Sequence, residues 1–184
     1  MSECIGFALI EKECLLYLDN NKNNLNAFLS GNEPSQNIGL FGRLLGKKSE
    51  QEIPGSWPTR NVETVILSGY ANYWSYIFTG SLNKVNVPLS FLSETFEQGD
   101  PSNYDYGEVE SFGMINENAR ILLAHLDTLE NVTVEIRVKE YFENEGQEAF
   151  ESDVEQALEE IGEFKVYISK IATSNSLGLL WYRS

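Results

Sequence analysis

Three features of the sequence predict an α+β fold formed by one domain over residues 1–184. Short apolar runs typical of buried strands lie near both ends, at residues 4–9 and 178–183. The stretches between them carry apolar residues at helical spacing, without a regular strand-helix-strand alternation. This order favours a small mixed or antiparallel sheet flanked by helices over a doubly wound parallel sheet. The length of 184 residues suffices for one domain with a substantial core.

The first third of the chain contains short structured segments separated by polar breaks. The run "CIGFAL" (4–9) predicts a buried strand, and residues 11–18 place their apolar side chains on one face of a helix. Two further runs, 24–31 and 37–48, are expected to form short helices. Residues 49–58 hold two prolines and a glycine, so we expect a loop there.

The middle of the chain contains the strongest helical pattern. Between Arg60 and Phe78, apolar residues recur at intervals of three and four, which is typical of an amphipathic helix that faces a core. We therefore expect one helix over this segment, with Gly80 as its C-terminal stop and Pro88 opening the next segment. The apolar residues of the pattern are Val62, Val65, Ile66, Tyr70, Tyr73, Trp74, Ile77 and Phe78.

The second half of the chain predicts mostly helix. Residues 107–114 are expected to include a strand, and Asn116 is suited to capping the helix that follows. Residues 132–142 fit either a strand or a helix, because their apolar side chains satisfy both spacings. From Val154 to Ile171 the helical spacing persists, which predicts one long C-terminal helix followed by the terminal strand at 178–183.

The composition indicates an acidic protein with an ordinary apolar content. The formal net charge is -15, which disfavours binding to nucleic acid or to anionic membranes and favours a basic protein partner. The N-terminus lacks the basic and apolar regions of a secretory signal, so we expect a cytoplasmic protein. Cys4 and Cys14 are then expected to be free thiols. The oligomeric state does not follow from these features.

The sequence motifs provide little support for a metal, cofactor or catalytic site. The run at 42–49 lacks the glycine spacing and the hydroxyl residue of a phosphate-binding loop, and the run at 19–30 lacks the glycine and glutamate of a calcium loop. His125 is the single histidine and lies on the apolar side of its helix, which favours a packing role. A pair of His125 with Cys4 or Cys14 stays open as a minor alternative.

An acidic run occupies residues 140–164, with ten Asp or Glu side chains and no Lys or Arg. The simpler interpretation is the solvated face of a helix whose inner stripe includes Val154, Leu158 and Ile161. The alternative is a surface that docks a basic partner. The residues predicted for such a surface are Glu143, Glu145, Glu148, Glu151, Asp153, Glu155 and Glu159.

An aromatic cluster around residues 70–78 and 91–106 also admits two interpretations. Core packing is the simpler one, because large aromatic side chains dominate most protein cores. A ligand pocket is the alternative, since pockets are lined mainly by apolar and aromatic side chains. The residues predicted for this pocket are Tyr73, Trp74, Tyr76, Tyr104 and Tyr106.

Four blocks of sequence, taken in order, carry a resemblance to a known family. They read "CIGFALIEKECLLYL" (4–18), "LFGRLLGKKSE" (40–50), "WSYIFTGSLNKVNVPLSFL" (74–92) and "YGEVESFGMINENARILLAHL" (106–126). Together they resemble the YfbM-like family of bacterial proteins. The resemblance implies a compact α+β domain that closes with a long helix and an apolar strand, and it implies no particular activity.

The chain departs from the pattern of the family at polar positions. Where the family tends to place a Trp-His pair before the Thr-Gly turn, this chain has Ala71 and Asn72. Where the family tends to have Gly-Tyr-Gly-Pro-Ala-Arg, this chain has residues 105–110, which read "DYGEVE". These replacements weaken the case for an enzyme.

Two functions follow as hypotheses. The first is a non-enzymatic, acidic binding protein, most concretely a bacterial immunity protein that neutralises a basic toxin, such as a nuclease, of the contact-dependent or type VI secretion kind. The second is a small-ligand-binding protein or an enzyme that uses the aromatic pocket.

Overall fold

The computed structural model describes residues 4–35, 52–81, 104–105, 110–114, 116–174 and 177–183. Within these residues, five strands form one antiparallel sheet in the order β2-β1-β5-β4-β3. The predicted α+β class is confirmed, as are the strands near both ends. The strands are β1 (Cys4–Ile10), β2 (Thr64–Ser68), β3 (Tyr104–Asp105), β4 (Glu110–Met114) and β5 (Leu177–Arg183).

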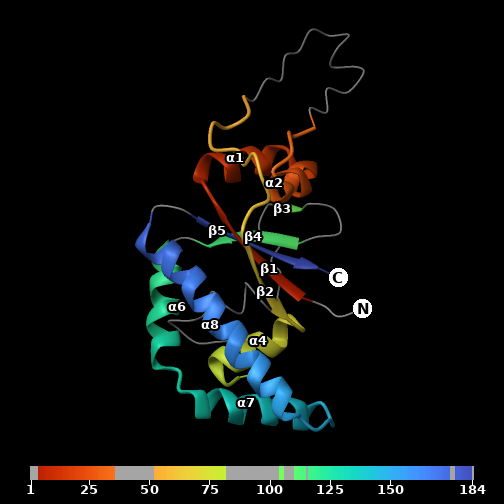
Figure 1. Cartoon of the computed structure of the whole chain (residues 1–184), viewed down its shortest axis with the longest axis vertical. Helices are drawn as coiled ribbons and strands as arrows, with labels where there is room; N and C mark the ends of the chain where they lie inside the picture. The colour runs from red at the N-terminus through yellow and green to blue at the C-terminus, as the bar shows by residue number, and fades with distance from the viewer. Residues whose placement is uncertain are drawn as a thin grey trace.

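Helices cover both sides of this sheet (Figure 1). Two short helices, α1 and α2, lie at one end of the molecule, while α4, α6, α7 and α8 lie on the other side of the strands. The helices are α1 (Lys12–Asn20), the 3-10 turn η1 (Lys22–Asn24), α2 (Leu25–Ser30), α4 (Ala71–Thr79), α6 (Asn116–Thr128), α7 (Asn131–Asn144) and α8 (Glu151–Thr173). Among the described residues, no helix combines the length and the apolar character needed to cross a bilayer.

Strand β1 separates two hydrophobic cores because its side chains point alternately to opposite faces of the sheet. Ile5 and Phe7 belong to the larger core, while Ala8 and Ile10 belong to the smaller one. Both faces are covered, so the strand reads as a continuous apolar run rather than as an alternating pattern.

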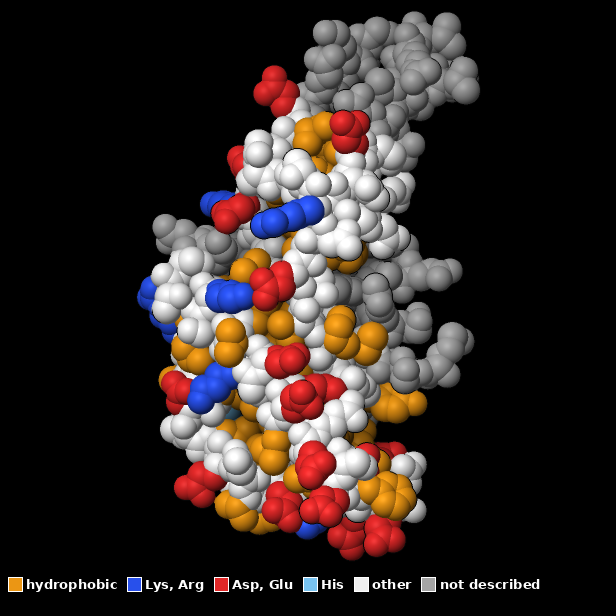
Figure 2. Space-filling view, in the orientation of Figure 1, with side chains coloured by type: hydrophobic (Ala, Val, Ile, Leu, Met, Phe, Trp, Pro, Cys, Tyr) orange, Lys and Arg blue, Asp and Glu red, His pale blue; other side chains and the backbone are white. Residues whose placement is uncertain are grey.

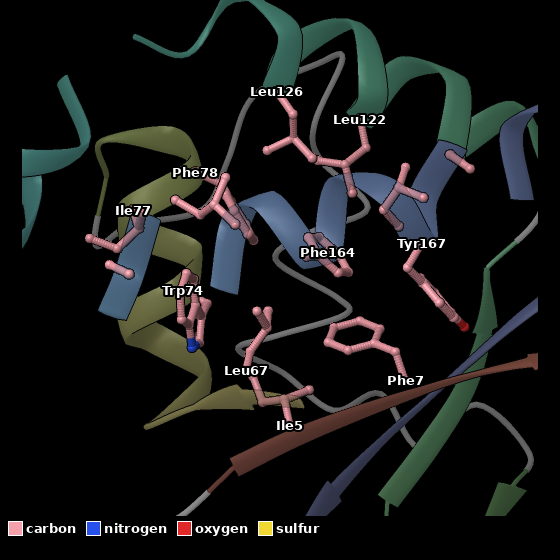
Figure 3. Packing of buried hydrophobic residues seen from close by; sticks show 14 of the residues in the cluster. Ile5, Phe7, Leu67, Trp74, Ile77, Phe78, Leu122, Leu126, Phe164 and Tyr167 are labelled. Carbon is pink, nitrogen blue, oxygen red and sulfur yellow. The ribbon is translucent and has the colours of Figure 1, made fainter. Parts of the chain in front are cut away.

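The larger core is built around Phe164 of α8 (Figure 3). Its ring lies 4.5 Å from that of Phe7 on the sheet and stacks on that of Phe78 of α4 at 5.6 Å. Leu122 and Leu126 of α6 approach the same region from above in Figure 3. The long C-terminal helix therefore joins the sheet to α4 and α6.

The smaller core places Trp57 against α1 and α2. The indole packs edge-on against Tyr17 at 5.3 Å and Phe28 at 5.4 Å, and its Nε1 donates a hydrogen bond to the Asn32 carbonyl at 2.8 Å. The described part of the predicted loop thus has an irregular backbone that is anchored by one buried tryptophan.

The prediction of one helix from Arg60 to Phe78 is wrong. The segment forms strand β2 and then helix α4, with a break at Gly69, whose φ is +98°. In the strand, Leu67 faces the larger core while Ile66 packs against the smaller one, which is the period-two pattern of a sheet covered on both faces. Because β2 has apolar residues on both faces and α4 begins shortly after it, their combined apolar residues fitted the spacing of one continuous helix. The predicted stop at Gly80 is confirmed, because this residue ends α4 with a φ of +71°.

The open choice for residues 132–142 is decided in favour of a helix, α7. Val134, Val138 and Tyr141 form its buried face at helical spacing, whereas Val132 and Ile136 are exposed. The long helix predicted near the C-terminus is confirmed as α8, which ends at Thr173 before strand β5. The predicted helix over 37–48 lies outside the described residues.

Candidate functional site

A cavity of about 510 Å³ lies between α4, α7 and α8, beside the end of β2. The turn after β2 and the first half of α4 form one side, and the other side comes from the ends of α7 and α8 that meet at residues 145–150. Its lining residues are Ser68, Gly69, Tyr70, Asn72, Tyr73, Trp74, Tyr141, Phe142, Glu145, Gln147, Asp153, Gln156, Ala157 and Glu160.

Four aromatic rings in the wall contact one another mostly edge to face. Tyr73 is the common member, with ring centroids 5.1 Å from Trp74, 5.0 Å from Tyr141 and 6.3 Å from Phe142. Trp74 is 1% exposed, and its Nε1 donates a hydrogen bond to the Ser68 carbonyl at 2.9 Å. This bond ties the first half of α4 to the end of β2 and holds the aromatic wall in place.

Three carboxylates line the same cavity. Glu160 accepts hydrogen bonds from the Ser68 backbone N–H at 2.6 Å and from Gln156 Nε2 at 2.7 Å. Asp153 accepts the backbone N–H of Phe150 at 2.7 Å and so caps the N-terminus of α8. Glu145 follows the last residue of α7 and is exposed. No Lys or Arg from the described part of the chain lines the cavity or pairs with these three side chains.

Two tyrosine hydroxyls in the wall stay protonated at neutral pH. Burial raises the pKa of Tyr73 well above its ordinary value, and the nearby charges of Glu160 and Asp153 raise it further. Burial likewise raises the pKa of Tyr141, whose hydroxyl donates to Asn72 Oδ1 at 3.1 Å. The cavity therefore presents neutral phenols and negative carboxylates.

The structure brings together part of the predicted aromatic pocket. Tyr73 and Trp74 line the cavity, and Trp74 also belongs to the larger core, so packing and pocket coexist at this residue. Tyr76 points elsewhere, because its hydroxyl donates to Glu140 Oε2 at 2.8 Å and the residue does not line the cavity. Tyr104 lies in β3, where only the backbone is described, and Tyr106 lies outside the described residues.

The predicted acidic set divides into two groups. Glu145 and Asp153 line the cavity, while the other five residues are exposed beside it. Figure 2 shows acidic side chains gathered at the lower end of the molecule, where α7 and the start of α8 lie in Figure 1. None of the seven pairs with a Lys or Arg of the described ranges. The five exposed residues are Glu143, Glu148, Glu151, Glu155 and Glu159.

Phe150 lies within this acidic group and is 70% exposed. It directly precedes α8 and follows the turn that leaves α7. We call the five exposed glutamates together with Phe150 the α7–α8 acidic surface. A large exposed aromatic ring that lies between Glu148 and Glu151 in the sequence, neither of which pairs with a Lys or Arg of the described residues, is unusual for a face that only solvates a helix.

Several cavity residues were not predicted from the sequence. Asp153, Gln156 and Glu160 repeat at intervals of three and four, so helical spacing could have placed Gln156 and Glu160 on the face of Asp153. Ala157 lies one turn after Asp153 on the same helix, so the same spacing could have placed it there too. The remaining unpredicted residues come from other elements, and no local pattern connects them to α8. They are Ser68, Gly69, Tyr70, Asn72, Tyr141, Phe142 and Gln147.

The residues considered for a Cys-His pair contact other groups. His125 Nε2 lies 2.5 Å from the Phe78 carbonyl, and Cys14 Sγ lies 3.2 Å from Ser56 Oγ in the smaller core. Burial raises the pKa of the Cys14 thiol, which opposes formation of a thiolate. Within the described ranges, no three Asp, Glu, His or Cys side chains are close enough together to hold a metal ion.

Comparison with solved structures identifies a similar fold. The chain matches the crystal structure of a protein of unknown function, YfbM from Escherichia coli, with a TM-score of 0.54 and 12% identity over 100% of both chains. The chain has a YfbM-like fold. No protein-family model and no curated protein matches it. At this identity the similarity concerns the fold, so the YfbM-like fold explains the sheet and the helices around it and leaves the acidic cavity to be explained from its own residues.

Proposed function

We propose that the protein is a non-enzymatic binding protein that docks a basic protein partner through the α7–α8 acidic surface. The observation that carries this proposal is the position of exposed Phe150 among carboxylates that have no basic partner in the described part of the chain. Protein interfaces commonly combine an aromatic anchor with a polar rim. Unpaired rim carboxylates also steer a basic partner toward its site.

The most concrete form of this function is that of a bacterial immunity protein. A toxin that cleaves nucleic acid carries a basic cleft for the phosphate backbone. An acidic protein that occupies the cleft in the cytoplasm would prevent substrate binding by both charge and volume. The net charge of -15 and the acidic side chains gathered at the lower end of the molecule in Figure 2 support such a role.

The test uses the protein encoded by the adjacent reading frame in the source genome. The purified pair is mixed at low and moderate salt, and binding is measured by calorimetry. We expect binding that weakens as salt rises, and we expect co-expression of this chain to restore growth of cells that make the partner. A neighbourhood of metabolic genes whose products do not bind this chain would contradict the proposal.

Charge-reversal variants locate the surface. Glu143→Lys, Glu151→Lys and Glu155→Lys together should weaken binding at least about tenfold, since each removes an attraction and adds a repulsion. A control with the same charge change uses Glu33→Lys, Glu52→Lys and Glu117→Lys, which are exposed residues away from this surface. Equal losses in both variants would show that net charge alone acts and would refute the docking surface.

The second candidate function is small-ligand binding, which the cavity beside α4 favours. Ligand sites are typically concave, largely aromatic or apolar, and furnished with a few polar groups. The cavity of about 510 Å³ combines an aromatic wall with carboxylates, phenols and amides.

A further inference from the structure

We infer that the cavity between α4, α7 and α8 is a binding site for a small organic cation, with an ammonium or quaternary ammonium group on an aliphatic stem. This inference rests on the second candidate function, that the cavity binds a small ligand. It does not depend on the docking of a protein.

The charge of the cavity selects a cation. Glu145, Asp153 and Glu160 all contribute to its wall, and no basic side chain of the described residues compensates them there. Carboxylates gathered in a cleft with low-dielectric walls concentrate positive ligands and repel anions. Phosphorylated and carboxylated metabolites are therefore disfavoured, because no Lys or Arg among the described residues of the wall would pair with their negative charge.

The aromatic wall selects an organic cation. The rings of Tyr73, Trp74, Tyr141 and Phe142 form a connected group in the wall, and the negative face of an aromatic ring attracts a cation within about 6 Å. Aromatic rings are a well-known means by which proteins recognise quaternary ammonium groups such as choline and methylated lysine. Tyr73 and Phe142 are partly exposed and give an aliphatic stem an apolar surface to contact, while Trp74 and Tyr141 are buried.

The spacing of the polar groups argues against a bare metal ion. Within the described residues, no three potential metal ligands converge closely enough to hold one. Charge that is spread over the wall of a cavity of about 510 Å³ suits a ligand of several heavy atoms. Gln147 and Gln156 supply amide groups in the same wall, and these can orient hydroxyl or amino substituents of the ligand.

The test measures ligand binding to the full chain by calorimetry, with tryptophan fluorescence as a second readout because Trp74 lines the cavity. The cationic probes are choline, spermidine and Nα-acetyl-lysine amide, and the last of these represents the side chain of a protein partner. The controls are 3,3-dimethyl-1-butanol, which is the neutral shape analogue of choline, and butyrate, which is an anion.

At least one cation should bind about tenfold or more tightly than the neutral and anionic controls, and should bind less tightly as salt rises. Preference for Nα-acetyl-lysine amide over the free amines would identify a protein side chain as the source of the cation. Tighter binding of the neutral or anionic probe would overturn the cation assignment and leave the second candidate function intact. Failure of every probe would overturn both.

Two variants test whether the cation binds in the cavity. Glu145→Gln should weaken cation binding about threefold or more, and it should leave the fold intact because Glu145 is exposed just after the end of α7. Glu159→Gln makes the same charge change on an exposed residue of α8 outside the cavity, and should change binding less than about twofold. Equal effects of the two variants would place the cation elsewhere on the surface.

The aromatic contribution needs a variant that keeps the charges. Phe142→Leu preserves an apolar side chain and removes one ring of the wall, so it should weaken choline binding and leave binding of 3,3-dimethyl-1-butanol nearly unchanged. A native circular dichroism spectrum confirms that the variant is folded. Equal losses for both probes would show that apolar contact alone acts, which would contradict recognition of a cation.

Discussion

Tyr73 shows how a single residue acquires properties that its local sequence does not contain. Its position in an apolar pattern predicted burial, and its aromatic ring made it a pocket candidate. Burial is the largest cause of its raised pKa, and the charges of Glu160 and Asp153, which belong to a helix far along the chain, raise it further. The sequence could therefore predict that Tyr73 is buried, but it could not predict the charges near the Tyr73 hydroxyl, because these depend on the tertiary contact between α4 and α8.

The raised pKa of Tyr73 predicts a loss of stability at alkaline pH. The folded protein holds this phenolic proton more tightly than the unfolded chain, so the contribution is fully present below the unfolded pKa of about 10 and is lost as pH rises above it. Urea denaturation should show a lower free energy of unfolding at pH 11 than at pH 8.

The variant Tyr73→Phe removes this phenol and keeps the ring. It should lose less stability between the two pH values than the parent protein does, whereas Tyr70→Phe, at an exposed ring, should behave like the parent. An identical alkaline loss in Tyr73→Phe and the parent would contradict the assignment to Tyr73.

At the scale of elements, the apolar spacing predicted most helices and failed where a strand is covered on both faces. β2 alternates between two cores, so its apolar residues run together with those of α4. The apolar residues of α7 fit the spacing of a strand as well as that of a helix. The segment is helical because Val134, Val138 and Tyr141 then contact neighbouring helices. The ends of α2 and α4 could be predicted because glycines occupy left-handed positions there.

Gly31 provides a test of how α2 ends. Its φ is +63°, and a Cβ at this position would overlap the backbone of Arg60. Gly31→Ala should therefore lower the free energy of unfolding by more than the roughly 1–2 kcal/mol that a left-handed alanine costs by itself. Chemical denaturation measures the difference.

Gly146 is the matched control for this prediction. It has a similar φ of +72°, but a Cβ there would have nothing within 4 Å. Gly146→Ala should show only the conformational cost of about 1–2 kcal/mol. If the two substitutions were equally destabilising, the close approach between α2 and Arg60 would have no energetic consequence.

At the scale of the whole molecule, the sequence predicted the fold class but not the order of the strands or the cavity. The order β2-β1-β5-β4-β3 depends on pairing between segments far apart in the chain. The cavity depends on the meeting of α4, α7 and α8. Glu145 and Asp153 were predicted for an exterior surface because a one-dimensional acidic run does not indicate which of its members face a neighbouring helix.

The excess of negative charge predicts that salt stabilises the whole molecule. Folding brings the 28 acidic side chains closer together, and added salt screens their repulsion. Raising NaCl from about 20 mM to about 300 mM should increase the free energy of unfolding on the order of 1 kcal/mol. Thermal and urea denaturation at both concentrations would measure this gain.

A variant with fewer charges serves as the control. Glu148→Gln, Glu151→Gln and Glu155→Gln remove three charges that have no basic partner in the described residues, so the gain with salt should be smaller. A parent protein that loses stability as NaCl rises would show that attractive ion pairs outweigh the repulsion.

The position of β5 also determines when the sheet can be completed during synthesis. β5 pairs with both β1 and β4, yet it is the last of the five strands to leave the ribosome. Until then, the pair of β1 with β2 and the pair of β3 with β4 each present an unpaired edge that another chain could join. Pairing across almost the whole chain is also slow, because distant segments must first meet. The edges of β1 and β4 therefore stay open in the nascent protein until residues 177–183 become available to close them.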